Sequence, residues 1–375
     1  MKNTFGNQIT VTLFGESHGE AIGVVIDGLS PGIEVSEEII ASCLAKRRPS
    51  SGIDTARREP DHFRIVSGVF QGKTCGTPVT VLIPNEDTRS KDYTYGPARP
   101  SHADYTAFCK YHGFEDYRGG GHFSGRITAA LVAAGGILIP ALEKKGIRIG
   151  THIFSCGGVE DLSLKAAMEE TDQPALRDYL ESCLKDLRNK AFPVLDDVSG
   201  AAMTKKILEA AEEKDSVGGV TETVVSGLPS GLGEPWFDSV ESELSHILFS
   251  IGGIKGVEFG SGFDFAKMSG SEANDSFRIS EEGQVYTETN HNGGINGGIT
   301  NGMPVLFRCA VKPTASIAKE QKTIDFQKQE NIGHKITGRH DPAIVRRVCP
   351  VIDSVTAIVI ADLLAGRFGT DYLGN

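Results

Sequence analysis

The chain has 375 residues, of which 39% are hydrophobic and 23% charged, and 38 basic against 49 acidic side chains give it a formal net charge of −11. A chain of this length can bury a substantial core as one large domain or two ordinary ones. The acidic balance argues against a general nucleic-acid-binding role. We expect no membrane-spanning run. The seven cysteines, odd in number and without a C-x-x-C pair, favour reduced thiols in a cytoplasm over disulfides or a metal site.

An alternating run over residues 8–14 predicts a first strand, which ends in the string GESHG at residues 15–19. This string fits the G-x-S-x-G elbow of serine hydrolases, in which a helix follows the serine. Residues 21–28 are instead β-branched and end in a turn, so a second strand is expected. The segment before the string is also too short for the elbow's scaffold. Ser17 and His18 are therefore predicted at a hairpin tip, either as exposed chemistry or as an ordinary polar loop.

Basic side chains gather after the next predicted element, an amphipathic helix over residues 36–46. The guanidinium group of arginine is suited to planar, bidentate binding of carboxylate and phosphate. A solvated face would explain any single arginine, but their concentration in an acidic chain favours a small anionic ligand. The arginines concerned are Arg47, Arg48, Arg57, Arg58, Arg89, Arg99, Arg118 and Arg126.

Short strands bounded by glycine are predicted over residues 63–70 and 78–84 with no helix between them, which favours antiparallel pairing. Beyond them, His102 lies close to Arg99 and Asp104, so it could act as a proton donor with a tuned pKa. The alternative is a structural histidine at the start of a helix, with Ser101 as the N-cap and Asp104 in the first turn.

A glycine-rich string, RGGGHFSGR at residues 118–126, precedes a long apolar helix predicted over residues 128–145. Three consecutive glycines permit positive φ and a close approach of the backbone to a ligand. With arginines on both sides, this segment predicts a phosphate or carboxylate cradle; a structural turn is the alternative. Pro140 should kink or interrupt the helix that follows.

Three sequence landmarks of the first half recur in the same order in the second half. We therefore predict a duplicated unit with pseudo-equivalent halves of about 1–150 and 215–365, separated by a helical insertion at about 160–214. The repeated landmarks precede helices predicted over 236–249 and 342–364, the latter containing Pro350. The fold class is α+β, with helices packed on antiparallel sheets in a single catalytic domain over 1–375.

The second half holds further candidate loops. Glycine pairs occur at residues 252–253 and 297–298, and Lys312–Ser316 offers a cation, hydroxyls and backbone amides, or is a plain surface loop. Arg339 and Asp341 directly precede the last predicted helix, where Asp341 could instead be a cap. The sequence contains no Walker or dinucleotide-binding cradle, and no metal motif.

Taken together, these strings resemble the chorismate synthase family along nearly the whole chain. The matching segments are residues 15–31, 99–105, 121–128, 215–219, 231–235, 312–314 and 339–343. The resemblance implies a trans-1,4 elimination of phosphate from 5-enolpyruvylshikimate 3-phosphate to give chorismate. It also implies reduced FMN without net redox change, NADPH only as an indirect reductant, and a homotetramer whose subunits have helices between two sheets. Neither nucleic acid nor a membrane is expected as a partner.

The same resemblance implies a role for each candidate residue. His18 would protonate the departing phosphate beside Ser17, His102 would be the proton partner of the flavin, and Asp341 would help to remove the flavin's proton. The residues implied to hold the substrate are Arg47, Arg48, Arg99, Arg126 and Arg339. The residues implied to contact the flavin are His122, Phe123, Ser124, Gly252, Gly253, Gly297, Lys312, Pro313, Thr314, Ala315, Ser316 and Arg339.

The chain departs from the family's usual pattern at a few of these positions. His122 and Phe123 stand where an arginine and a serine are common, the pair Gly252-Gly253 stands where an Asn-Ala or similar pair is commoner, and Asp353 stands where a glutamate is usual. Each departure bears on an individual flavin contact more than on the overall function.

Two other functions fit parts of the sequence. A flavin-dependent oxidoreductase would reduce its flavin with a nicotinamide cofactor, but the chain shows no long insertion beyond ordinary family length, so we expect reduced flavin to be supplied externally. A non-catalytic protein that binds a phosphorylated metabolite would suit the arginine and glycine patterns. In such a binding protein, however, no role would be assigned to Ser17, His18, His102 and Asp341.

Overall fold

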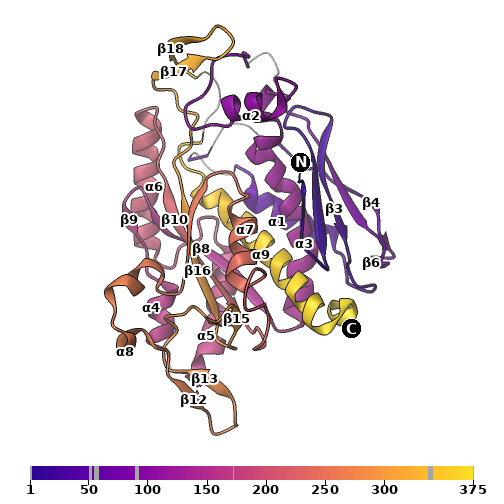
Figure 1. The fold of residues 1–375 in the computed structure, drawn as a ribbon, viewed down its shortest axis with the longest axis vertical. Coiled ribbons are helices and arrows are strands. Elements are labelled where there is room, and N and C mark those ends of the chain that lie inside the picture. Colours follow the sequence, from indigo (N-terminus) through magenta and orange to yellow (C-terminus); the bar gives the residue numbers. More distant parts are fainter. Residues whose placement is uncertain are drawn as a thin grey trace.

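The N-terminal half of the chain forms a five-stranded sheet (Figure 1) in the computed structural model, which describes residues 2–49, 53–54, 59–88, 93–171, 173–336 and 341–374. The strands lie in the order β1-β2-β3-β7-β4, and all neighbours are antiparallel. Strict alternation in β7 buries Val79, Val81 and Ile83 on one face. The bounds are β1 Thr4–Phe5, β2 Thr10–Gly15, β3 Ala21–Asp27, β4 Arg64–Ser67 and β7 Val79–Pro84, with a separate hairpin of β5 Val69–Phe70 and β6 Lys73–Thr74.

The second half forms another antiparallel sheet, in the order β11-β16-β10-β8-β9. Its strands are β8 Arg148–Cys156, β9 Val159–Glu160, β10 Gly219–Ser226, β11 Ile254–Phe259 and β16 Val305–Val311. Small hairpins pair β12 Phe277–Ile279 with β13 Val285–Thr287, β14 Ile295–Asn296 with β15 Ile299–Thr300, and β17 Gln321–Asp325 with β18 Glu330–His334.

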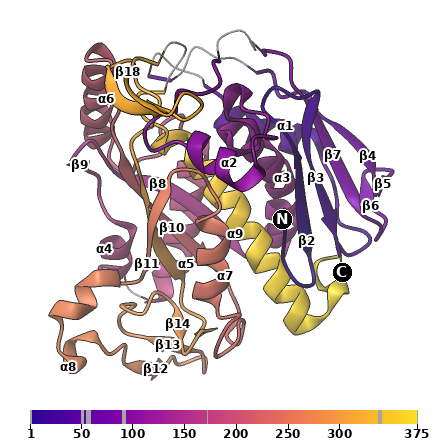
Figure 2. The same ribbon diagram turned by 45° about the horizontal axis from the view of Figure 1, so that its top comes forward.

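Helices fill the space between the two sheets (Figure 2), so the predicted α+β fold with sandwiched helices is confirmed. Helix α3 packs on β3 and β7, helix α9 packs on β8 and β10, and the two helices pack on each other. Small residues allow this close contact, because a Cβ at Gly135 would lie 2.2 Å from Oγ of Ser354. The central helices are α1 Glu37–Arg47, α3 Thr128–Lys144, α7 Val240–Leu248 and α9 Val345–Phe368, while α2 Asp104–Tyr111 and α8 Gly270–Ala273 lie elsewhere.

Two expectations about the long helices need correction. The expected interruption at Pro140 and Pro350 does not occur: α3 and α9 continue through them, because burial of most of each helix outweighs the single backbone hydrogen bond that each proline removes. Residues 125–144 and 345–368 are also long and apolar enough to cross a membrane, contrary to our expectation of no such run. Of the most apolar window in each, 78% and 83% is buried inside the structure, as in the core helices of a globular domain.

The two sheets share one order of elements. The order β2-β3-β7-β4 in the first sheet matches β8-β10-β16-β11 in the second, and α1 and α7 follow the second strand of each set, whereas α3 and α9 follow the last. This correspondence supports the duplication, which we retain as a proposal. It would place the start of the second half at β8, near Arg148, ahead of the helical insertion and not after it.

The insertion covers the outer face of the second sheet. Its helices are α4 Leu164–Glu169, α5 Gln173–Asn189 and α6 Asp197–Glu212. Leu164, Leu180 and Leu184 pack there against Val224 and Leu306 of the sheet.

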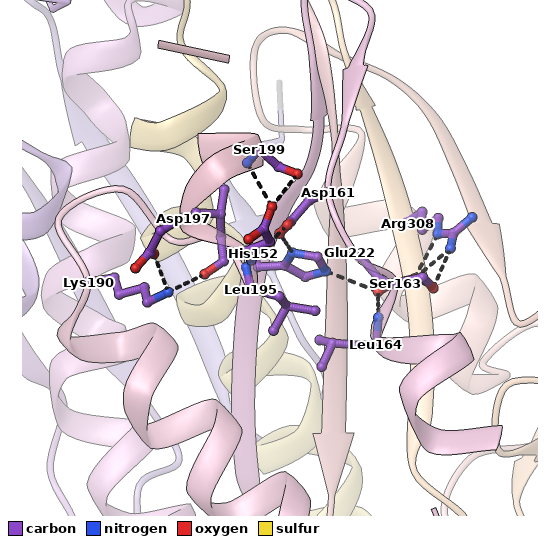
Figure 3. A network of polar contacts seen from close by, with 12 residues as sticks. His152, Asp161, Ser163, Leu164, Lys190, Leu195, Asp197, Ser199, Glu222 and Arg308 are labelled. Atoms are coloured by element: carbon purple, nitrogen blue, oxygen red, sulfur yellow. Dashed lines mark hydrogen bonds and ion pairs between the residues drawn. The ribbon is translucent and has the colours of Figure 1, made fainter. Parts of the chain in front are cut away.

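A buried charge network joins the insertion to the sheet (Figure 3). His152 on β8 contacts Asp161 through Nδ1 at 3.2 Å and Glu222 on β10 through Nε2 at 3.0 Å. Arg308 donates to Glu222 from Nε at 2.9 Å and from Nη2 at 2.7 Å, and Glu222 also accepts from the backbone N–H of Leu164. Because an unpaired charge is costly in a dry interior, the network holds the start of α4 at one place on the sheet.

We expect this network to make stability depend on pH. Burial alone would lower the pKa of His152, but hydrogen bonds and charges from Asp161 and Glu222 outweigh it and raise that pKa. Burial would raise the pKa of both carboxyls, but their contacts with His152 lower it. The carboxylate contribution is therefore lost as pH falls below about 4.5, and the imidazolium contribution, complete below about pH 6.5, is lost as pH rises through the raised folded-state pKa.

Urea unfolding of the wild type and His152→Gln between about pH 5 and pH 9 tests this expectation. The difference in free energy of unfolding should be on the order of 3 kcal/mol near pH 6 and should shrink toward pH 9. A difference that stays constant across this range would show that His152 is not charged in the folded protein.

Candidate functional site

A cavity of about 660 Å³ opens where the β2–β3 hairpin, the end of α1, the start of α2 and the glycine-rich segment meet. It brings together most of the predicted site residues, although they come from distant parts of the sequence. Those that line it are His18, Arg47, Arg48, Arg99, His102, His122, Phe123, Ser124, Arg126, Thr314, Ser316 and Asp341. Arg339 lies outside the described residues, as do Arg57, Arg58 and Arg89.

The tip of the β2–β3 hairpin is the predicted one, but it is buried and not exposed. Ser17 is fully buried and His18 is 8% exposed, and the backbone N–H of Ser17 donates to the carbonyl of Gly121 at 3.0 Å. The His18 ring meets the ring of Tyr93 edge-on, with centroids 5.1 Å apart. Asn85 fixes the loop by donating from Nδ2 to the carbonyls at residues 16 and 19. A buried histidine in a cavity wall is a better candidate for chemistry than a solvated loop.

The glycine-rich segment packs directly on both candidate histidines. Gly119, Gly120 and Gly121 have φ values of 61°, 84° and 53°, which side chains rarely adopt. A Cβ at Gly119 would lie 2.2 Å from Nδ1 and Cε1 of His18, and a Cβ at Gly120 would lie 3.3 Å from Nε2 of His102. Only glycine therefore permits this approach, and the role of the segment as an anion cradle stays a prediction.

Two buried arginines of the cavity wall share one carboxylate, that of Asp61. Nη2 of Arg47 donates to Asp61 at 3.1 Å, and Nη1 of Arg126 donates to the other oxygen of Asp61. Arg126 is held further by Oδ1 of Asn85 at 2.9 Å and the carbonyl of Pro84 at 3.0 Å. The Asp61 side chain is fully buried, and its φ of 56° is unusual for a residue other than glycine.

The arginine pair retains capacity for an anion. Burial lowers the pKa of Arg47 to about 10, against the opposing charge of Asp61, so its guanidinium is still protonated at neutral pH. Its buried Nε has no hydrogen-bond partner in the described part of the chain. Two cations facing one carboxylate leave a net positive charge, and a buried donor without an acceptor is costly. A bound phosphate or carboxylate would balance the excess positive charge and could accept a hydrogen bond from the unpaired donor.

Asp341 is far from Arg47 and Arg126 in the sequence, and it pairs with an arginine that we did not predict. Nη1 of Arg347 donates to Asp341 at 2.5 Å, and Nε of Arg347 donates to the carbonyl of Arg47 at 2.9 Å. Arg48 donates to the carbonyl of Pro60 at 2.8 Å. These contacts tie the end of α1 to the start of α9 beside the cavity.

The structural alternative for His102 is partly wrong. Asp104 lies in the first turn of α2 as that alternative required, but the helix begins only at Asp104, its N-cap is Ala103, and no side chain caps it. Ser101 lies two residues before that cap with φ of 58°, so its hydroxyl is not in the N-cap position.

Several predicted flavin contacts do not line the cavity. Lys312 donates from Nζ to the carbonyl of Ser101 at 2.7 Å and from its backbone to the carbonyl of Gly253 at 2.9 Å, so both lie close to the loop that carries His102. Gly297 lies in the turn between β14 and β15, which Figure 1 shows far from α2. The predicted contacts that lie off the cavity wall are Gly252, Gly253, Gly297, Lys312, Pro313 and Ala315. Their roles stay predictions, as do those of the lining residues.

The sequence reasoning missed Asp61, Asn85, Tyr93 and Arg347. An acidic residue inside an arginine-rich stretch was a usable signal for Asp61, since a buried guanidinium needs a counter-charge. No sequence signal marked Asn85 or Tyr93. Among the residues that the structure describes, no group of three or more His, Cys, Asp or Glu side chains is placed to hold a metal ion.

Comparisons with known proteins agree on one family. The family model described as chorismate synthase matches residues 9–365. A chorismate synthase of Pyrococcus abyssi is 45% identical over 96% of this chain and 97% of its own length, and one of Cytophaga hutchinsonii is 44% identical with the same coverage. A crystal structure of chorismate synthase aligns with a TM-score of 0.76 at 29% identity, covering 98% of this chain and 94% of that one.

Proposed function

The chain belongs to the chorismate synthase family, and we propose that it converts 5-enolpyruvylshikimate 3-phosphate to chorismate by a trans-1,4 elimination of phosphate, with reduced FMN and without net redox change. One observation carries this proposal. A buried histidine, two buried arginines and a positive-φ glycine segment meet in one cavity, where a phosphate leaving group needs a proton and cations.

We propose that the cavity, with a volume of about 660 Å³, holds a second anionic ligand, the flavin, beside the substrate. The glycine segment lets bare backbone line the cavity wall beside His18 and His102, and the buried Nε–H of Arg47 lacks an acceptor among the described residues. We propose that His122, Phe123, Ser124, Thr314 and Ser316 hold the flavin, since they line the same cavity. When bound, reduced FMN supplies the transient electron donation that helps an allylic phosphate to leave.

The chain's own residues bind, orient and move protons. In the reaction a C–H bond and the C–O bond to phosphate break, a ring double bond forms, and phosphate leaves. We propose that Arg47 and Arg126, fixed by Asp61, hold the substrate's anionic groups, and that His18 gives a proton to the departing phosphate. Burial of this site excludes water, which strengthens the field of the two arginines on the leaving group.

His102 and Asp341 are proposed to manage the remaining protons. His102 lies against Gly120 on the cavity wall, where it can hold a proton next to a ligand in the glycine cradle. Asp341, which accepts a hydrogen bond from Arg347 and lines the same cavity, is proposed as a proton acceptor. Arg48 is a further proposed substrate contact, together with Arg339 outside the described residues.

We further propose a homotetramer working in the cytoplasm. Large apolar side chains stay exposed on the loop before α7, where Trp236 is 78% and Phe237 is 89% exposed. On the β12–β13 hairpin, Phe277, Ile279 and Val285 are exposed on one face. Exposed apolar surface of this kind favours burial in an assembly.

Anaerobic turnover separates the proposal from the two other functions. With 5-enolpyruvylshikimate 3-phosphate and added reduced FMN, the purified protein should release phosphate, whereas with NADPH and oxidised FMN alone it should do nothing. Flavin reduction by NADPH without another enzyme would indicate the oxidoreductase, and binding without phosphate release would indicate a non-catalytic protein.

A further inference from the structure

A fully bonded carboxylate lies behind His102. Asp104, the first residue of α2, accepts from Arg99 at Nε (2.8 Å), at Nη2 (2.7 Å) and at the backbone N–H (2.9 Å). Its Oδ1 is also 2.8 Å from Nδ1 of His102. All three side chains are mostly buried, with 14–20% of each exposed. Burial alone would raise the pKa of Asp104, but these hydrogen bonds outweigh it and hold that pKa below its ordinary value, so Asp104 is a carboxylate near neutral pH.

This arrangement decides which nitrogen of neutral His102 carries the proton. A carboxylate oxygen can only accept, so its contact with Nδ1 requires a proton on Nδ1. Arg99 Nη2 also lies 3.0 Å from Nδ1, but it is closer to Oδ1, which it already serves as donor. The free imidazole prefers the proton on Nε2, so the Asp104 contact reverses the ordinary preference. Nε2 is then left on the side of Gly120 and the cavity.

The guanidinium of Arg99 binds the carboxylate of Asp104. Two of its nitrogens bind Asp104, and the third lies 3.5 Å from Oγ of Ser316. Arg47, in contrast, keeps a buried donor without a partner in the described residues. Of these two predicted substrate arginines, Arg47 therefore has a donor available for an anion, whereas the donors of Arg99 are used within the protein.

We infer that Asp104, clamped by Arg99, is a positioning residue that fixes the Nδ1–H tautomer of His102 and so leaves Nε2 as the atom that exchanges the catalytic proton. Arg99 accordingly acts on His102 through Asp104 and not on the substrate. The kinetic consequences rest on the proposed function, whereas the tautomer does not.

Long-range proton–nitrogen NMR on protein labelled with [15N]histidine tests the tautomer without turnover. The resonance of His102 is identified among the ten histidines by its loss in His102→Gln. The wild type should show the Nδ1–H form when neutral. In Asp104→Asn the amide oxygen should turn to the two donors now at Oδ2, which puts the amide N–H against Nδ1 and switches His102 to the Nε2–H form. An Nε2–H form in the wild type, or no switch in the variant, would overturn the inference.

A double-mutant cycle measures whether Asp104 acts through His102. Asp104→Asn should lower kcat by about 10²–10⁴-fold with little change in KM, as loss of the correct tautomer does in other acid–base sites. In the His102→Gln background the same substitution should have almost no further effect. An equal fold loss in both backgrounds would mean that Asp104 is merely structural. Asp264→Asn, at an exposed ion pair, is the matched control that should leave kcat unchanged.

Arg99→Lys tests the reassigned arginine. A lysine cannot make the two-pronged contact with Asp104, so kcat should fall while KM for the phosphorylated substrate stays within about twofold. A raised KM with unchanged kcat would show that Arg99 binds substrate and would overturn its assignment. If the wild type makes no chorismate, the proposed function fails, and the NMR result still decides the tautomer.

Discussion

Replacing His18 with alanine is expected to lower kcat by about 10²–10⁴-fold, the usual contribution of a positioned general acid. The imidazole lies in the cavity wall, in contact with the ring of Tyr93 and the backbone of Gly119. The hairpin tip should keep its shape, because Asn85 holds it through backbone carbonyls and not through the imidazole. The loss should therefore fall on turnover and not on folding.

Anaerobic steady-state kinetics with reduced FMN, together with a melting curve of each protein, measure this effect. His62→Ala is the matched control, since the His62 side chain is 76% exposed and pairs with Glu86 at the surface. It should leave kcat unchanged. If His18→Ala turned over at the wild-type rate while melting normally, His18 would not be the proton donor.

Asp61→Asn is expected to cost about 3 kcal/mol of the free energy of unfolding, as breaking a buried ion pair does. The substitution leaves two buried guanidiniums, of Arg47 and Arg126, without their shared negative charge. Asparagine tolerates the left-handed backbone at φ 56° as well as aspartate does, so backbone strain does not confuse the result. KM for the substrate should also rise, because the arginines lose their fixed orientation.

Urea unfolding measures the stability loss, with Asp178→Asn on the exposed face of α5 as the control. The control should change the free energy of unfolding by less than about 0.5 kcal/mol. A loss in Asp61→Asn as small as in the control would mean that solvent, and not Asp61, balances the two arginines.

The local elements around the site were readable from the sequence because they depend on short-range patterns. Alternation over residues 8–14 and the β-branched run over 21–28 predicted the hairpin that carries Ser17 and His18, and the pairing of β2 with β3 confirms it. The three glycines predicted a special backbone, and their φ values are all positive. The helix boundaries at Glu37 and Thr128 also lie within one residue of the predictions, since an N-cap at Ser36 and a short turn mark them.

Contacts between distant segments were not readable. Asp61 meets Arg47 across 14 residues and Arg126 across 65, and only the folded sheet brings them to one point. The burial of His18 follows from the glycine segment and Tyr93 packing over the hairpin tip, which no local pattern encodes. Pro350 does not interrupt α9, because the tertiary burial of that helix outweighs a local preference.

The measurement that tests the central claim most directly is the ratio of chorismate formed to FMN oxidised in a sealed anaerobic reaction. A catalytic amount of reduced FMN should support many turnovers, with one phosphate released for each chorismate and the flavin still reduced at the end. Oxidation of one FMN for each product molecule, or phosphate release without chorismate, would contradict an elimination without net redox change.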